Sequence, residues 1–142
     1  MRSLLDVNVL IALFDPDHTL HETASRWLKA NIRDGWASCP LTQNGFIRVT
    51  SQPGYSHPLP VDVVAERLRE AVSHSHHEFW PDDVSLLDTA AVDTKRIHGP
   101  RQLTDVYLLS LAVAHGGRLV TFDRALPLEA VVGAQKKHLV VI

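Results

Sequence analysis

Three aspartates occupy positions from which they could act together. Asp6 and Asp123 each end a short apolar run, and Asp105 falls in the first turn of an expected helix. In an open parallel sheet, ligands bind beyond the carboxyl ends of the strands, so the two strand-end aspartates can converge. The positive end of the helix dipole favours a carboxylate at Asp105. Three carboxylates in one cleft raise one another's pKa unless a cation lies among them, and oxygen ligands favour Mg²⁺ or Mn²⁺ over zinc.

A structural interpretation competes with this one at each single position. An aspartate after a strand is often only a helix cap or a turn former. Ser85-Leu86-Leu87-Asp88 repeats the letters of Ser3-Leu4-Leu5-Asp6, yet it equally fits a capping box, and we assign Asp88 a structural role. Asp82 and Asp83, after Pro81, are expected to be turn or cap residues. The metal prediction therefore depends on the joint placement of the three aspartates.

Short strands alternate with helices along the chain. We expect strands over 3–6, 35–39, 118–123 and 138–142, and helices over 7–14, from Thr19 through Leu28, from Thr42 to Pro53, over 61–72 and over 105–115. Such alternation predicts an α/β domain with a mainly parallel sheet covered by helices on both faces. The length of 142 residues predicts one domain over 1–142.

The segment with His74, His76 and His77 lies between two apolar stretches. We expect it to be a solvated loop, although three clustered histidines also leave a metal site open.

Composition excludes several classes of protein. Apolar residues make up 45% and charged residues 21%, which is ordinary globular usage and argues against disorder. The net charge of −2 argues against binding nucleic acid by bulk charge, so any such contact must be a local groove. Cys39 is the only cysteine, which fits a reducing compartment and excludes a cysteine-built metal site. The longest apolar run, Val9 to Phe14, is far below the ~20 residues of a membrane span, and no export signal follows Met1, so we expect a cytoplasmic protein without membrane contact.

Four blocks together resemble one known family. They are Leu4 to Ala12 (LLDVNVLIA), Cys39 to Phe46 (CPLTQNGF), Leu103 to Leu109 (LTDVYLL) and Val120 to Asp123 (VTFD). Their order and spacing resemble the PIN-domain family, and most closely its VapC branch, the ribonuclease toxins of type II toxin–antitoxin pairs. The resemblance covers essentially the whole chain. It implies a three-layer α/β/α fold with a short central sheet, a Mg²⁺- or Mn²⁺-dependent endoribonuclease acting on RNA, a cognate antitoxin that covers the active groove, and a homodimer.

The resemblance also assigns roles to residues. The catalytic, metal-binding aspartates of the family fall on Asp6, Asp105 and Asp123. Asn8 and Thr121 are candidates for orienting Asp6 and Asp123. The expected reaction is hydrolysis of a phosphodiester bond by a metal-activated water, which leaves a 5′ phosphate.

One family position differs in this chain. The glutamate that the family carries after the second strand corresponds to Gln43. A glutamine offers a carbonyl oxygen or a hydrogen bond to water, but it carries no charge and cannot act as a base near neutral pH. Arg101 and Arg124, next to the acidic positions, are candidates for contacts with the RNA backbone, and exposed arginines on a solvated face are the alternative.

Two other functions stay open. Asp6-Val7-Asn8-Val9 after a strand resembles the nucleophile loop of haloacid dehalogenase-type phosphatases, but Asn8 stands where that family has an acid/base aspartate, and no matching later block follows. The second alternative is a PIN scaffold with weakened catalysis that binds RNA or a partner protein, which the glutamine at position 43 motivates.

Overall fold

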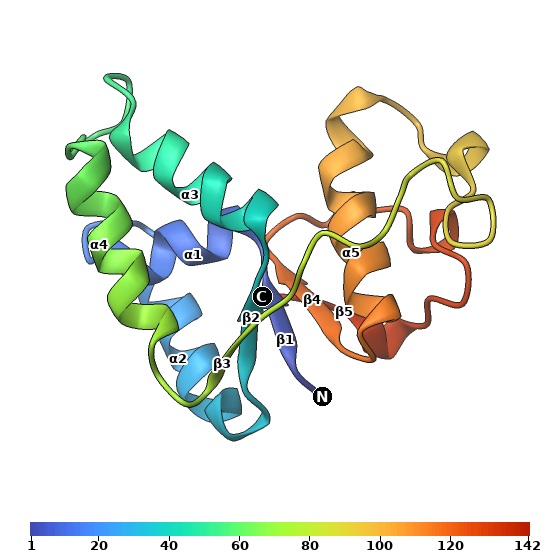
Figure 1. Ribbon diagram of the computed structural model, residues 1–142, viewed down its shortest axis with the longest axis horizontal. Coiled ribbons are helices and arrows are strands. Elements are labelled where there is room, and N and C mark those ends of the chain that lie inside the picture. The colour runs from blue at the N-terminus through green and yellow to red at the C-terminus, as the bar shows by residue number, and fades with distance from the viewer.

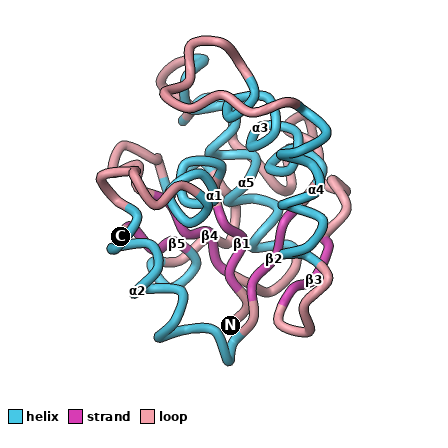
Figure 2. Tube along the Cα trace, turned by 90° about the vertical axis from the view of Figure 1, so that its left-hand side faces the viewer, coloured by secondary structure: helices cyan, strands magenta, loops and turns pink.

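The computed structural model describes all residues, 1–142, and its centre is a five-stranded parallel sheet. The strands are β1 (Ser3–Leu5), β2 (Trp36–Ser38), β3 (His77–Phe79), β4 (Arg118–Thr121) and β5 (Leu139–Val141). They lie in the order β3-β2-β1-β4-β5, and each neighbouring pair is parallel. Figure 2 shows the five strands side by side in this order. The mainly parallel sheet expected from the sequence is confirmed.

Helices cover both faces of the sheet and complete three layers. Four helices lie on one face, namely α1 (Val7–Phe14), α2 (His21–Asn31), α3 (Pro40–Ser51) and α4 (Val61–Val72), and α5 (Leu103–Ala114) lies on the other (Figure 1). Each face has its own apolar cluster, one around α5 and one around α1, α3 and α4. The three-layer α/β/α architecture is therefore confirmed. No helix combines the length and the apolar character that a bilayer crossing requires.

The third strand was not predicted. His77–Phe79 pairs in parallel with β2, whereas we expected this segment to be loop. The sequence signal is weak because β3 is an edge strand of three residues that are half-buried or exposed, so it lacks the apolar run of a central strand. His74 and His76 are exposed in the turn before it, as expected for a solvated loop.

Two helices begin earlier than their expected caps, and α2 begins one residue later than expected. α2 begins at His21, and Leu20 caps it without a side-chain hydrogen bond, in place of Thr19. α3 begins at Pro40, with Thr42 in its first turn, where the Thr42 hydroxyl accepts from the Cys39 amide at 3.0 Å. α5 begins two residues before Asp105, and Thr104 does not cap it. In α3 and α5 a polar residue of the first turn was taken for the cap.

Gly45 lets α3 lie close against α1. A Cβ at this position would come within 2.7 Å of Cγ2 of Val7, closer than two carbon atoms can pack. Gly45 is buried, and it permits the approach that brings the start of α3 beside the start of α1. This packing places the first turns of both helices at the carboxyl edge of the sheet.

Candidate active site

The carboxyl ends of β1 and β4 form the core of the site. These two strands pair in parallel at the centre of the sheet, and the Asp6 amide donates to the Val120 carbonyl at 3.0 Å. Asp6 directly follows β1, and Asp123 follows β4 by two residues. Because both strands end at the same edge, the two carboxylates lie near each other, and the negative charge of Asp123 contributes to raising the pKa of Asp6.

Asp6 is both a helix cap and a member of the acidic cluster. Its Oδ1 accepts from the Val7 amide at 2.7 Å, which caps the N-terminus of α1. Its side chain is otherwise buried, with only 5% of the residue exposed. Burial is the main reason that the pKa of Asp6 is raised, and hydrogen bonds from Thr121 and Val7 oppose this rise. Asp6 therefore caps a helix and is also one of the clustered carboxylates, so the two interpretations of this residue are compatible.

Thr121 links the groups of the site. Its hydroxyl donates to Oδ2 of Asp6 at 2.6 Å and accepts from the backbone amide of Asp123 at 3.1 Å. The side-chain amide of Asn8 also donates to this hydroxyl, at 3.4 Å. Thr121 is fully buried, so its χ1 angle and its hydroxyl are held by packing. The two auxiliary residues expected from the sequence thus contact each other beside Asp6.

Asp105 reaches the same cluster from the other side of the sheet. It lies in the first turn of α5. Burial raises its pKa to about 7, and the negative charge of Asp6, a hydrogen bond to the Asp123 carboxylate and the charge of Asp123 add to the rise. The structure therefore brings all three aspartates together, and the carboxyl group of Asp105 keeps its proton up to about neutral pH when no cation balances the charge of the cluster.

Gln43 points to a different neighbour. Its Nε2 donates to the Ser38 hydroxyl at 2.9 Å, and no hydrogen bond joins it to any of the three aspartates. The Ser38 hydroxyl in turn contacts Nε2 of His77 at 2.8 Å. The pKa of His77 is lowered, mainly by burial, and its ring also hydrogen-bonds the backbone of Val72. This partly buried polar chain joins α3, β2 and β3. It could not be predicted from the sequence because Ser38 and His77 are 39 residues apart.

The two arginines are exposed at either side of the acidic positions. Arg101 lies in the 3₁₀ turn before α5, and Arg124 directly follows Asp123. Neither forms an ion pair within the chain. Asp88, by contrast, is exposed in a turn, where its Oδ1 accepts from the Ala90 amide at 2.9 Å. Its structural assignment agrees with this contact, although no helix follows Ser85.

The donor groups of the cluster fit a hard divalent cation in type and in charge. All are oxygens, and no ion pair within the chain balances the charge of Asp6, Asp105 or Asp123. The buried Oδ1 of Asn8 has no hydrogen-bond partner, which a cation or one of its waters could satisfy. No group of three or more Asp, Glu, His or Cys side chains forms a ready-made metal cluster, so the fit depends on chemistry and charge and not on a preset cage.

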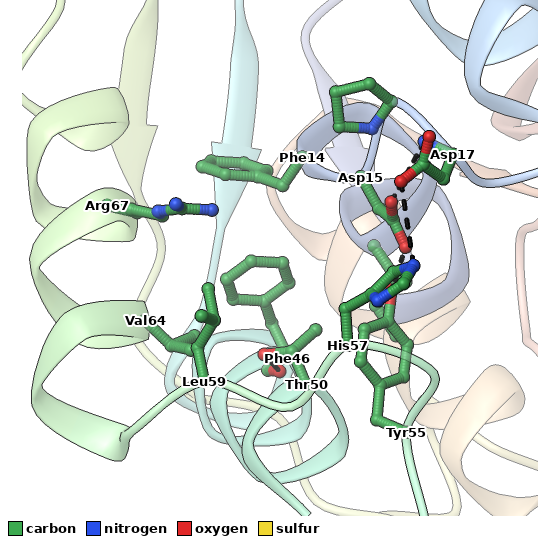
Figure 3. Close-up of a pocket in the computed structure, with 12 residues that line it drawn as sticks. Phe14, Asp15, Asp17, Phe46, Thr50, Tyr55, His57, Leu59, Val64 and Arg67 are labelled. Atoms are coloured by element: carbon green, nitrogen blue, oxygen red, sulfur yellow. Dashed lines mark hydrogen bonds and ion pairs between the residues drawn. The ribbon is translucent and has the colours of Figure 1, made fainter.

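Another cavity lies away from the aspartates, between the C-terminal end of α1, α3 and the start of α4. Figure 3 shows the Phe14 and Phe46 rings on its wall, with centroids 4.8 Å apart, and Arg67 facing them from α4. Its volume is about 260 Å³, and the Tyr55 hydroxyl donates to Asp15 across it at 2.5 Å. None of the clustered aspartates lines this cavity, so it is separate from the site.

A short parallel sheet with carboxylates gathered at its carboxyl edge defines an α/β protein with an acidic site. The family model of the PIN domain matches residues 3–131, and the chain belongs to the PIN domain family. It is 55% identical over 139 residues to Ribonuclease VapC44 of Mycobacterium tuberculosis, with 98% of each chain covered. It is 42% identical to Ribonuclease VapC39 of the same species, with 94% of this chain and 96% of that protein covered. The family resemblance found in the sequence is thereby confirmed.

A solved structure is similar in fold. The structure of VapBC2 from Rickettsia felis, bound to a DNA fragment from the promoter, matches with a TM-score of 0.61 at 12% identity and covers 100% of this chain and 98% of that one. At this identity the likeness concerns the fold alone, and it agrees with the three layers described above.

Proposed function

We propose that this protein is an endoribonuclease, the toxin of a type II toxin–antitoxin pair, which hydrolyses RNA with Mg²⁺ or Mn²⁺ held by Asp6, Asp105 and Asp123. The observation that supports it best is the acidic cluster, in which burial, together with the two other carboxylates, raises the pKa of Asp105 to about 7. The relatives named Ribonuclease VapC support the choice of RNA as the substrate.

The residues of the chain have distinct tasks in this proposal. Asp6 and Asp123 supply oxygen ligands at the ends of two adjacent strands, and Asp105 adds a third from the helix above them. When bound, the divalent cation lowers the pKa of a water and balances the charge that develops on the phosphoryl oxygens. Water oxygen bonds to phosphorus while the bond to the 3′ oxygen breaks, and the proton leaves with that oxygen, which yields a 5′ phosphate and a 3′ hydroxyl.

Thr121 and Asn8 keep the carboxylates in place. The Thr121 hydroxyl holds Oδ2 of Asp6 and the Val7 amide holds Oδ1, and each oxygen keeps a further lone pair for a cation. Arg101 and Arg124 are free of ion pairs and can contact the RNA backbone at the cleft edge. A cognate antitoxin that covers the acidic cluster and a homodimeric state complete the proposal. The similar VapBC2 structure, which is named for two components, agrees with such a partner.

The test is cleavage of RNA by purified protein with Mg²⁺ or Mn²⁺. We expect Asp6→Asn and Asp105→Asn each to abolish cleavage. Asp88→Asn is a matched control, because Asp88 ends the same four-letter sequence as Asp6 but lies in an exposed turn. Normal cleavage by both cluster variants would refute the proposal. Sequencing of RNA 5′ ends after brief induction in cells would then locate the cut.

One observation favours a second function, a binding module with weak hydrolysis. The family glutamate is replaced by Gln43, whose amide is occupied by Ser38, so this position adds no charge to the cluster. Calorimetry separates the two functions. Absence of Mg²⁺ or Mn²⁺ binding at millimolar ion would favour the binding module, and higher activity in Gln43→Glu would favour an enzyme with reduced activity.

A further inference from the structure

A small apolar pocket lies beside the acidic cluster, between the first turns of α3 and α5. Its volume is about 310 Å³, and its lining residues are Leu41, Asp82, Leu86, Leu103, Thr104 and Tyr107. Two of these are large apolar side chains that stay exposed, Leu41 at 36% and Leu103 at 40%. No lysine or arginine lines it. An apolar hollow with an open mouth and one negative charge is suited to an uncharged, flat ligand.

The pocket is close to the three aspartates. Leu103, Thr104 and Tyr107 share the N-terminal turns of α5 with Asp105. Asp105 faces the cluster, while the pocket lies on another side of the same turns, so the two are separated by about the width of a helix, roughly 10 Å. Leu41 is in the first turn of α3, which begins at the same edge of the sheet as Asp6. A ligand in the pocket and a phosphate at the cluster can therefore belong to neighbouring parts of one RNA chain.

The walls of the pocket are fixed before any ligand binds. The Asp82 carboxylate accepts from the Leu41 amide at 3.1 Å, which ties the segment after β3 to α3. Burial raises the pKa of Tyr107 to about 12, and the negative charge of the nearby Asp82 adds to the rise. Leu86 and Tyr107 pack against the apolar cluster on the α5 face. The pocket is thus a preformed hollow of the kind that binds small ligands.

We infer that this pocket holds one unpaired nucleobase of the RNA, next to the phosphate at the acidic cluster; this rests on the proposed function. Proteins recognise single-stranded RNA by splaying out a base and stacking it on apolar and aromatic side chains. Asp82 repels phosphate, which favours the base over the backbone as occupant. The remaining acceptor capacity of Asp82 can receive one exocyclic amino group of a base. The pocket then selects the base beside the cut.

The test uses Leu103→Ser and Leu41→Ser, because both side chains are exposed and their loss leaves the core intact. Leu87→Ser is the matched control, since Leu87 is 89% exposed on the neighbouring loop and lies outside the pocket. The substrates are short RNAs that each carry one abasic site, placed at a different position in each RNA. For the wild type, the KM should be about tenfold higher than for intact RNA when the abasic site lies at one particular position flanking the cut. Leu103→Ser should raise KM about tenfold on intact RNA with kcat within twofold. For this variant, an abasic site at that same position should not raise KM any further.

Two results would overturn the inference. One is an abasic profile that is the same in the wild type, Leu103→Ser and Leu41→Ser. The other is unchanged RNA kinetics in both variants together with weaker antitoxin binding, which would assign the pocket to the protein partner. Binding of the same RNAs to Asp6→Asn protein, followed by fluorescence anisotropy, gives the abasic profile without cleavage. Failure of the wild type to cut RNA would therefore count against the proposed function, while the anisotropy profile still decides the pocket.

Discussion

The Thr121 hydroxyl donates a 2.6 Å hydrogen bond to Oδ2 of Asp6, from the end of β4 to the end of β1. Because the same oxygen accepts the amide of Asp123, one buried side chain sets the positions of two of the three aspartates. The hydrogen bond also lowers the pKa of Asp6 against the opposing effect of burial. Thr121 therefore orients Asp6 and favours its ionised form at the same time.

Thr121→Val should lower the rate of RNA cleavage by roughly 10- to 100-fold, the usual effect of losing a group that orients a metal ligand. Valine fills the space of threonine but leaves the Asp123 amide without its acceptor and Asp6 without its donor. Thr121→Ser restores both contacts and should retain most of the activity. Equal activity of the valine variant and the wild type would show that this contact does not orient Asp6.

Asp105→Asn should stabilise the metal-free protein at high pH. The folded pKa of about 7 lies above the ordinary value of 3.8, so the folded chain binds more protons than the unfolded chain between these pH values. Stability therefore falls as the pH rises from about 4 through about 7. At pH 8 the asparagine variant should gain on the order of 2 kcal/mol over the wild type, after allowance for solvent screening at a half-buried site.

Urea denaturation in the presence of a chelator measures this gain at pH 4.5 and at pH 8. The difference between variant and wild type should be small at the lower pH. Asp88→Asn, in an exposed turn, should show no such pH dependence. A stability difference that stays constant from pH 4.5 to pH 8 would contradict the mutual repulsion of the carboxylates.

Gly45→Ala should destabilise the fold by about 1–3 kcal/mol, because its methyl group meets Cγ2 of Val7 and valine has a stiff χ1 angle. Gly54→Ala is the matched control, since a Cβ there meets nothing within 4 Å. Adding Val7→Ala to Gly45→Ala should recover part of the loss. Thermal denaturation of the wild type, the Gly45→Ala and Val7→Ala single variants and the double variant measures it. Strict additivity of the two substitutions would show that the helices do not meet at this point.

Gln43→Glu should raise the pKa of His77. In the wild type the Gln43 amide donates to Ser38, so the Ser38 hydroxyl is free to donate to the neutral His77 ring. A carboxylate at position 43 accepts instead, which draws the Ser38 proton away and favours a second proton on the imidazole. NMR titration of the His77 ring measures the shift, and Gln43→Ala, which brings no charge, should raise the pKa less. An equal shift in both variants would contradict the polar chain.

The sequence predicted the layers and the acidic cluster because both depend on local patterns. Strands such as Ser3–Leu5 are fully buried and read as apolar runs, and the aspartates after them are fixed to the sheet edge by the parallel topology. β3 could not be predicted in this way, because an edge strand with one buried face or none has no apolar run.

The contacts between polar side chains also could not be predicted from the sequence. Ser38 pairs with Gln43 and with His77, and the Leu41 amide pairs with Asp82. The longer of these contacts join residues 39 and 41 positions apart, and no spacing rule encodes them. The resemblance aligned Gln43 with the glutamate of the family, but Gln43 makes no hydrogen bond to any of the three aspartates. Only the three-dimensional arrangement shows that this glutamine binds Ser38 at the end of β2, and that Ser38 in turn contacts His77 of β3.

Calorimetric titration of the purified protein with Mn²⁺ tests the central claim most directly. The account predicts binding by the wild type and by Asp88→Asn, and binding that is at least tenfold weaker or lost in Asp6→Asn, Asp105→Asn and Asp123→Asn. Equal binding by all five proteins, or no binding by the wild type at millimolar Mn²⁺, would contradict it.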